Sequence, residues 1–253
     1  MPAQLTGQQS QSLSAPILIT GAGQRAGLEL AKSFLARQQP VVFSYRSPKA
    51  GVDELLALGA LGIQADFISN QAIIDFIRQV QQATPKLRGI IHNASSWLPD
   101  VADPLQQAQA FQALFLVHQQ APLLLNMQLA PLLQAYYRTS GQLADIIHLT
   151  DDVVRRGSRK HAAYAASKAA LENLTFSCAQ LLAPEVKVNA IAPALLAFNQ
   201  GDAPDYQHQA LRKSLLGLEP GFGVLVQTVE FLLAQNHLTG AVVPLNGGRH
   251  LRS

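Results

Sequence analysis

Short apolar runs alternate with longer segments of helical period along almost the whole chain. The helical patterns cover 25–38, 51–58, 70–83, 104–137, 161–182 and 206–235, the last with a break at Pro220 and Gly221. Strands that alternate with helices in this way build a parallel sheet with helices on both faces. We therefore expect an α/β fold, a doubly wound sheet of about seven strands, formed by 16–20, 41–45, 61–65, 88–92, 144–149, 186–191 and 240–245.

The chain has the size and composition of one large domain. It has 253 residues, of which 48% are hydrophobic and 14% charged, so it can bury a sizeable core. Residues 1–14 are polar and predict a flexible N-terminal arm before a single domain over 15–253. The most apolar stretch, 111–133, is interrupted by polar residues and two prolines, so we expect no membrane span. The single cysteine, Cys178, fits a reducing cytoplasm and a packing role.

The charge favours an anionic small molecule over a nucleic acid. The net charge is +3 and the sequence pI is about 9.1, which is below a nucleic-acid signature. The basic run "RRGSRK" at 155–160 has no interleaved aromatic residue, so it predicts a solvated loop near the mouth of a site, attractive to anions such as folates. The seven histidines are scattered, and we expect no metal site.

The junction "ITGAGQRAGLELA" after the first predicted strand carries glycines at 21, 23 and 27. Such a turn lets the backbone approach a pyrophosphate, as in Rossmann-type dinucleotide sites. Its spacing is T-G-x-x-x-R-x-G, with Arg25 where a third glycine would be common. We expect Arg25 to touch the phosphates or an anionic part of the substrate. The simpler interpretation is an exposed residue in the first helical turn.

The second strand predicts the cofactor. It ends in "SYRSP", where an NAD site usually has an acidic residue, and Arg46 there, with Ser47 beside it, favours the 2′-phosphate of NADPH. A surface arginine is the alternative. Asp66 follows the third strand and is expected at the adenine edge, and Asn93 follows the fourth and is expected along the cofactor.

A tyrosine and a lysine, Tyr164 and Lys168, stand four residues apart on a predicted helix and so share one face. A cation beside a phenol favours the phenolate, which makes the tyrosine an acid or base near neutral pH. The lysine can also reach a nicotinamide ribose. Asp151 comes thirteen residues before the tyrosine, after the fifth strand.

With these motifs the chain resembles the short-chain dehydrogenase/reductase family over nearly its whole length after about residue 15. Most members carry a serine in place of Asp151 and glycines in place of Arg25 and Ser95. The pteridine reductase subgroup departs at all three positions and follows "NASS" with an aromatic residue, here Trp97. The shared motifs are T-G-x-x-x-R-x-G, "NAS" (93–95), Y-x-x-x-K, "VNAIAP" (188–193) and "NGG" (246–248).

Within the subgroup the chain is most similar to the bacterial dihydromonapterin reductases, through "KHAAYAASKAALENLT" and the ending "GGRHLR". The resemblance implies NADPH-dependent reduction of dihydromonapterin to tetrahydromonapterin, with dihydrofolate as a secondary substrate. It also implies three sets of site residues. The catalytic set is Asp151, Tyr164 and Lys168. The substrate set is Arg25, Ser95, Trp97, Asp151 and Tyr164. The cofactor set is Gly21, Arg25, Ala26, Gly27, Tyr45, Arg46, Ser47, Asp66, Phe67, Asn93, Ala94, Ser95, Tyr164, Lys168 and Pro193.

The chemistry of a C=N bond gives Asp151 a role. The bond takes a hydride on carbon and a proton on nitrogen, and an aspartate can hold the tyrosine as a proton donor or relay protons from water. A serine suits a carbonyl oxygen instead. The flat pterin is expected between the nicotinamide and Trp97. Asp152 is expected to be structural. His118 stands where many family members have an asparagine that holds a proton-relay water, and it is left outside the site.

Two other functions stay open. One is an NADPH-dependent carbonyl or quinone reductase of the same family, which leaves Arg25, Trp97 and Asp151 unexplained. The other is a non-catalytic dinucleotide-sensing protein, a class that commonly lacks the Tyr-Lys pair. We expect no membrane or nucleic-acid partner and a homotetramer, the assembly this family often forms through the helices near 111–133 and 161–182.

Overall fold

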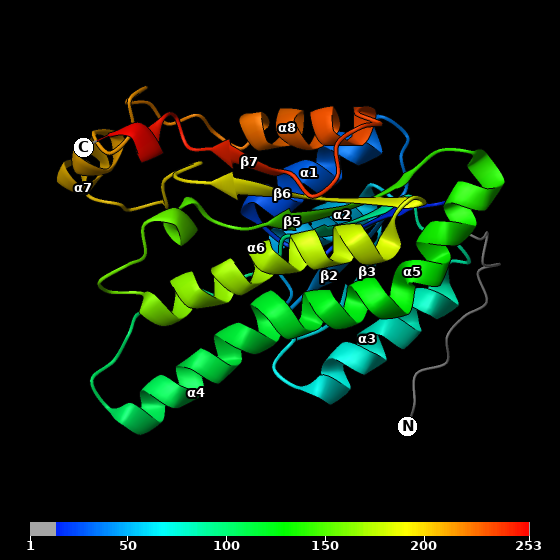
Figure 1. Ribbon diagram of the computed structural model, residues 1–253, viewed down its shortest axis with the longest axis horizontal. Coiled ribbons are helices and arrows are strands. Elements are labelled where there is room, and N and C mark those ends of the chain that lie inside the picture. Colours follow the sequence, from blue (N-terminus) through cyan, green and yellow to red (C-terminus); the bar gives the residue numbers. More distant parts are fainter. Residues whose placement is uncertain (1–13, 253) are drawn as a thin grey trace.

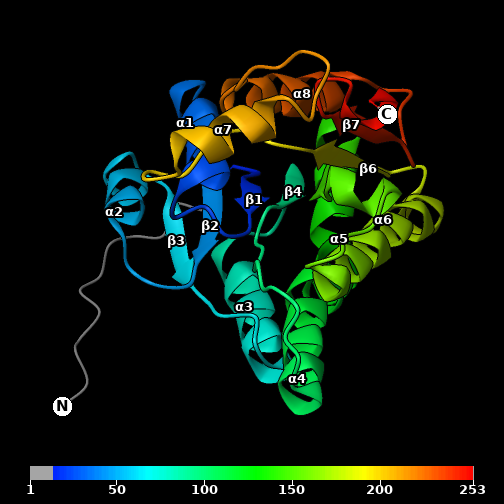
Figure 2. The same ribbon diagram turned by 90° about the vertical axis from the view of Figure 1, so that its left-hand side faces the viewer.

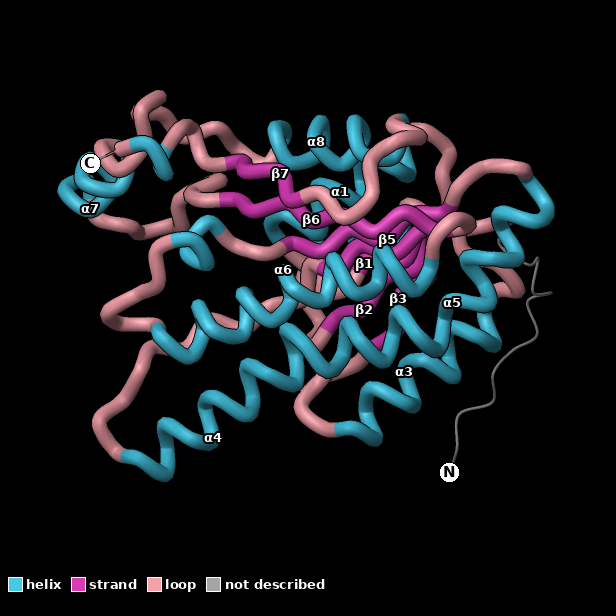
Figure 3. The backbone as a smooth tube through the Cα atoms, in the orientation of Figure 1, coloured by secondary structure: helices cyan, strands magenta, loops and turns pink. Residues whose placement is uncertain are grey.

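The computed structural model describes residues 14–252 and contains one seven-stranded sheet (Figures 1 and 3). All neighbouring strands are parallel, and their order is β3-β2-β1-β4-β5-β6-β7. The strands are β1 (Ile17–Ile19), β2 (Val41–Tyr45), β3 (Leu61–Gln64), β4 (Gly89–His92), β5 (Ala144–Leu149), β6 (Val186–Pro193) and β7 (Val242–Leu245).

Helices cover both faces of this sheet (Figure 2). They are α1 (Arg25–Ala36), α2 (Ala50–Ala57), α3 (Asn70–Ala83), α4 (Pro104–Phe115), α5 (Ala121–Ser140), α6 (Ala162–Leu182), α7 (Pro204–Leu211) and α8 (Gly223–Ala234). Three short helices join them: the π-helix η1 (Leu116–Gln120) and the 3-10 helices η2 (Asp152–Arg155) and η3 (Arg249–Leu251). No helix in the described part of the chain is long and apolar enough to cross a membrane.

Two cores, one on each face, explain why the strands read as continuous apolar runs. Along β1, Ile17 and Ile19 face the core formed with α1, α2 and α8, whereas Leu18 faces the core formed with α3, α5 and α6. Because both faces of a parallel sheet are buried, successive strand residues are mostly apolar rather than alternating with polar ones. Cys178 lies in the second of these cores, with no exposed surface, as expected for a packing residue.

The predicted elements are confirmed, with two differences. The segment predicted as one helix over 104–137 is divided by η1 and continues to Ser140, where Gly141 takes a left-handed conformation (φ 70°). The segment over 206–235 is two separate helices, α7 and α8, and the break predicted at Pro220 and Gly221 extends over the eleven residues 212–222. The predicted arm lies outside the described residues except for Ser14.

One ionic pair is buried in the sheet, away from the strands' carboxyl ends. Asp145 on β5 pairs in register with Lys187 on β6, and the Lys187 Nζ lies 2.9 Å from the Asp145 Oδ1. The lysine also donates to the carbonyls of Leu232 and Gln235 at the end of α8. Burial raises the pKa of the Asp145 carboxyl to about 6, against the charge of Lys187. This pair therefore joins α8 to the sheet at an electrostatic cost.

The strand order reverses direction between β1 and β4. In open parallel sheets, ligands bind in the crevice outside the carboxyl ends of the strands at such a switch point. The loops after β1, β2, β4, β5 and β6 converge at this end of the molecule, together with α7 and the C-terminus (Figure 1).

Candidate active site

The turn after β1 is tied to the loop after β4. The Thr20 hydroxyl accepts hydrogen bonds from the backbone N–H groups of Asn93 and Ala94, both at 3.0 Å. The Asn93 amide donates to the carbonyls of Thr20 (3.0 Å) and Gly21 (2.8 Å). The Asn93 side chain therefore braces the turn, besides lining the cavity beside it.

Two positions of the turn require glycine, because neighbouring atoms lie too close to leave room for a side chain. Gly21 has φ 70°, and a Cβ there would lie 2.8 Å from the Cα of Ala94. A Cβ on Gly27 would lie 2.5 Å from the Asn93 amide nitrogen and 2.7 Å from the Gly21 carbonyl oxygen. Any side chain at either position would separate the turn from the loop after β4.

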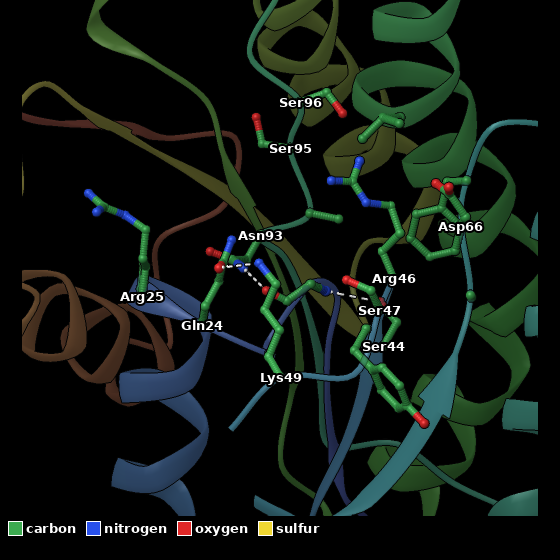
Figure 4. A pocket seen from close by; sticks show the side chains of 18 residues that line it. Gln24, Arg25, Ser44, Arg46, Ser47, Lys49, Asp66, Asn93, Ser95 and Ser96 are labelled. Atoms are coloured by element: carbon green, nitrogen blue, oxygen red, sulfur yellow. Dashed lines mark hydrogen bonds between the residues drawn. The ribbon is translucent and has the colours of Figure 1, made fainter. Parts of the chain in front are cut away.

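A cavity of about 320 Å³ opens beside this turn, and Figure 4 shows the side chains that line it. Arg46 and Asp66 lie on one side of it and Arg25 on the other (Figure 4). A third cation, Lys49, also lines the cavity and donates a hydrogen bond to the side-chain oxygen of Gln24. Lys49 was not among the predicted residues, although "RSPK" places it three positions after Arg46.

Arg25 connects the turn to the loop after β6. Its guanidinium donates to the Ala197 carbonyl and the Asn199 side-chain oxygen, both at 2.8 Å, and lies 5.3 Å from the Phe222 ring centroid. Its backbone has φ 52°, in the left-handed region, where a residue other than glycine is strained by about 1–3 kcal/mol. Arg25 lines both the first cavity and a second, larger one.

The predicted catalytic residues meet in this second cavity, which has a volume of about 970 Å³. The Tyr164 hydroxyl donates to the Asp151 Oδ2 at 2.9 Å. The other carboxylate oxygen of Asp151 accepts from the Val153 N–H at 2.8 Å and so caps η2. The Lys168 Nζ donates to the Leu149 carbonyl at 2.8 Å and lies 5.9 Å from the centroid of the Tyr164 ring.

Burial sets the protonation of this group. It raises the pKa of the Tyr164 phenol far above its ordinary value, and the charge of Asp151 raises it further. Burial also raises the pKa of the Asp151 carboxyl, although the hydrogen bond from the Val153 N–H and the charge of Lys168 act to lower it. Burial lowers the pKa of Lys168 to about 8. In this arrangement burial and Asp151 raise the pKa of the phenol, so the expected shift of Tyr164 towards the phenolate is not seen.

Trp97 lies against the tyrosine at the mouth of the second cavity. Its ring centroid is 4.4 Å from that of Tyr164, edge to face, and 4.1 Å from that of His161. The indole is nevertheless 59% exposed, so one of its faces is free. A large exposed aromatic beside a buried phenol offers a surface for a flat ring.

His118, which sequence reasoning left outside the site, connects the segments that form it. The residue lies in η1, is fully buried, and has a ring centroid 5.4 Å from that of Tyr164. Its Nε2 accepts from the Ser96 N–H at 3.2 Å and lies 2.8 Å from the Ser95 hydroxyl, and its Nδ1 lies 2.8 Å from the Ser167 hydroxyl. Burial, with the charge of Lys168, lowers its pKa to about 2. His118 is therefore a neutral imidazole that joins the loop after β4 to α6.

Asp152 points away from the site, as expected of a structural residue. Its carboxylate accepts from the Asn246 amide at 2.6 Å and from the Arg156 guanidinium at 2.5 Å. The "NGG" segment thus anchors the loop after β5 to the C-terminal part of the chain.

Most of the predicted residues line one of the two cavities. The first contains Gly21, Arg25, Ala26, Tyr45, Arg46, Ser47, Asp66, Phe67, Asn93, Ala94 and Ser95. The second contains Arg25, Ser95, Trp97, Asp151, Tyr164 and Lys168. The predicted cofactor residues Gly27 and Pro193 line neither: Gly27 lies behind the turn, and Pro193 pairs with Leu245 at the end of β6, one residue before the cavity-lining Ala194.

Comparison with known proteins identifies the family to which the chain belongs. A model of the short chain dehydrogenase family matches residues 15–204. A dihydromonapterin reductase from Klebsiella pneumoniae subsp. pneumoniae is 49% identical over 238 residues, 94% of this chain and 97% of that protein. A dihydromonapterin reductase from Escherichia coli is 48% identical over 240 residues, 94% of this chain and 98% of that protein.

Two solved structures share the fold at 25% sequence identity and a TM-score of 0.82. One is a FolM alternative dihydrofolate reductase 1 from Brucella canis complexed with NADP, and the match covers 97% of this chain and 98% of that one. The other is the FolM protein from Brucella suis in complex with NADP, at 96% and 98% coverage.

Proposed function

The chain belongs to the short-chain dehydrogenase family, and on that premise we propose that it reduces a dihydropterin with NADPH. The substrate is dihydromonapterin, reduced to tetrahydromonapterin, and dihydrofolate is a secondary substrate, in line with the names of its relatives. The observation that carries the proposal is the hydrogen bond between Tyr164 and Asp151. It places an acid, rather than the serine that suits a carbonyl oxygen, against the phenol.

The residues of the first cavity fit NADPH. Gly21 lines this cavity, in the turn after β1 where Rossmann-type sites hold a pyrophosphate. Arg46, Ser47 and Lys49 are assigned to the 2′-phosphate, since two cations and a hydroxyl at the end of β2 suit a dianion. Ser95, Tyr164 and Lys168 are assigned to the nicotinamide end, at the border of the two cavities.

The chain's own groups deliver the proton. When bound, NADPH supplies the hydride that the carbon of the substrate C=N bond receives. Tyr164 donates its phenolic proton to the ring nitrogen, and a protonated Asp151 returns a proton to the phenol oxygen. The raised pKa of the Asp151 carboxyl favours this form. Asp151 then regains its proton from water in the open second cavity.

Substrate orientation is assigned to three side chains. The free face of Trp97 stacks on the pterin, and Arg25 and Ser95 bind its polar edges. Support comes from their position: all three line the second cavity together with Asp151 and Tyr164.

The test is NADPH oxidation with dihydromonapterin, with dihydrofolate and with a panel of ketones and quinones. The proposal expects the highest kcat/KM with dihydromonapterin. A higher kcat/KM with a ketone or quinone would indicate a carbonyl reductase. Tight NADPH binding without turnover of any compound would indicate a dinucleotide-sensing protein.

The assembly is part of the proposal. Apolar side chains stay exposed on the outer face of α4, α5 and α6, among them Phe111, Met127 and Phe176 at 40–43%. Beside them, Ala162 and Ala166 on α6 allow close helix packing. We expect a homotetramer through this face. Light scattering at micromolar concentration should give four times the monomer mass, and a monomeric mass would refute the assembly.

Arg46→Asp is expected to weaken NADPH binding by about 10²-fold or more and to leave NADH binding within a few-fold, because it replaces a partner of the 2′-phosphate with a repelling charge. Fluorescence titration with each cofactor measures both constants. Arg37→Asp, an exposed arginine outside the cavity, is the matched control. Equal losses for both cofactors would show that Arg46 is not at the 2′ position.

His118→Leu is expected to lower kcat about tenfold, because it leaves the half-buried Ser96 N–H without its acceptor and releases Ser95 and Ser167. Since the pKa of His118 lies near 2, its imidazole stays neutral over the working range and supplies no proton. The shape of the pH profile above about pH 5 should therefore be that of the wild type. Loss of a titrating limb would make His118 a proton donor instead.

A further inference from the structure

The second cavity continues well beyond the groups that reduce the substrate. Its volume of about 970 Å³ is near the upper end of ligand pockets, so it leaves space beyond a pterin ring assigned to Trp97 and Arg25. The outer wall is formed by the loop after η2, the segment after α7 and η3, which lie at the same end of the molecule (Figure 1).

This outer wall is cationic. Four of its side chains carry positive charge, and Asp151 is the only carboxylate that lines the cavity among the described residues. The other two lining cations, Arg25 and Lys168, lie on the inner side and are held by backbone carbonyls. The four outer cations are Arg156, Arg159, Lys213 and Arg249.

The charges of the outer wall are only partly neutralised by the protein. Asp152 lies behind the wall, accepts from Arg156, and is 3.8 Å from the Arg249 Nε, so one carboxylate serves two guanidiniums. Within the described residues, the buried Arg249 Nε has no hydrogen-bond partner. Neither Arg159 nor Lys213 forms an ion pair in the same part of the chain.

Like charges held together at the wall of a cleft concentrate the positive field there and favour an anion. The proximity of the two guanidiniums supports this, because the charge of Arg156 contributes to lowering the pKa of Arg249. A hydroxylated pterin side chain has no charge to offer such a wall. A substrate tail that ends in a carboxylate or phosphate carries a negative charge that these cations can bind.

We propose that Arg156, Arg159, Lys213 and Arg249 form a subsite for an anionic group on the substrate's side chain, which strengthens the binding of dihydropterins with a charged tail. The subsite rests on the proposed function, since it extends the same cavity. Its chemistry accepts a carboxylate, as on the glutamate of dihydrofolate, or a phosphate, as on dihydroneopterin monophosphate. It assigns to the basic loop at 155–160 a direct contact with substrate.

The test uses the single tryptophan of the chain, Trp97, as a fluorescent probe at the cavity mouth. The NADP-saturated protein is titrated with uncharged dihydromonapterin, with dihydrofolate and with dihydroneopterin monophosphate. The variant is Arg159→Gln combined with Lys213→Gln, since both residues are exposed and free of ion pairs. The matched control is Lys160→Gln with Arg212→Gln, which removes the same charge from adjacent exposed positions that do not line the cavity.

The variant should weaken binding of a charged substrate, relative to dihydromonapterin, by about tenfold, and the control by less than about twofold. The affinity of the wild type for the charged substrates, relative to dihydromonapterin, should also fall as salt is raised. A loss confined to dihydrofolate or to the phosphate identifies which anion the wall takes. An unchanged ratio in the variant, or equal losses in variant and control, overturns the subsite. Because binding is measured, absence of turnover would overturn the proposed function and leave the result for the subsite standing.

Discussion

Asp151→Ala is expected to lower kcat for dihydropterin reduction about 10²–10⁴-fold while NADPH still binds, because general acid assistance is typically worth that factor. The carboxylate contacts Tyr164 and Val153 but does not line the first cavity. Stopped-flow kinetics measure the chemical step, and a fluorescence titration measures NADPH binding. A kcat within a few-fold of wild type would remove Asp151 from the proton transfer.

Tyr164→Phe should lower kcat by a similar factor. The double variant with Asp151→Ala should lose little more than either single variant, because two groups that act as one unit give non-additive effects. Losses that multiply would show instead that Asp151 and Tyr164 act independently.

The pH dependence has a definite sign. A raised pKa means that the Asp151 carboxyl keeps its proton to higher pH than an ordinary aspartate. If the protonated form resupplies Tyr164, kcat falls as the pH rises through that pKa. Asp151→Asn, which cannot ionise, should lack this limb of the profile.

Lys187→Met is expected to lower the free energy of unfolding by about 3–5 kcal/mol, because it leaves a buried carboxylate without its partner. The site is untouched, so urea denaturation measures stability alone. Because the folded-state pKa of Asp145 is above the unfolded value, stability is lost as the pH rises through that pKa. The destabilisation should therefore be larger near about pH 8 than near about pH 5.

Two variants make this prediction specific. Arg78→Met breaks the exposed pair with Asp75, 3.3 Å apart, and should cost less than about 1 kcal/mol. Adding Asp145→Asn to Lys187→Met removes the unpaired charge and should recover much of the loss. If the double variant is no more stable than Lys187→Met, the buried charge is not the cause.

The sheet could be predicted because its central strands are buried on both faces. Runs such as 17–19 stay apolar over their length, and a parallel sheet is the structure that hides both faces at once. The π-helix could not be predicted, because the apolar period continues through Leu116–Gln120 while only the hydrogen bonding changes. The break between α7 and α8 could be predicted from Pro220 and Gly221, but its length could not, because no residue pattern marks the end of α7 at Leu211.

Within the site, spacing gave the shared face of Tyr164 and Lys168 but not the protonation, because burial decided the sign of the pKa shift. His118 was missed for a related reason. Its partners Ser95 and Ser167 lie 23 and 49 residues away and are brought to it by the packing of η1 against α6. Arg25 was expected at the cavities and lines both, but its contacts with Ala197 and Asn199 come from a loop that the sequence did not place.

Asp151 caps η2 and contacts the phenol of Tyr164, and a substitution by serine distinguishes these two roles. Its cap on η2 can be replaced by a serine hydroxyl, since serine is a good N-cap. A serine hydroxyl cannot replace the carboxylate that lies beside the Tyr164 phenol. Asp151→Ser therefore preserves the loop and removes the acid, and it restores the residue that suits a carbonyl oxygen.

The most direct test is kcat for dihydromonapterin and for a panel of ketones in wild type and Asp151→Ser, with thermal stability measured on the same samples. We expect dihydromonapterin reduction to fall about 10²-fold or more, any ketone reduction to persist or rise, and the melting temperature to change little. Dihydromonapterin kcat within a few-fold of wild type, together with a lower melting temperature, would contradict the account and reduce Asp151 to a cap.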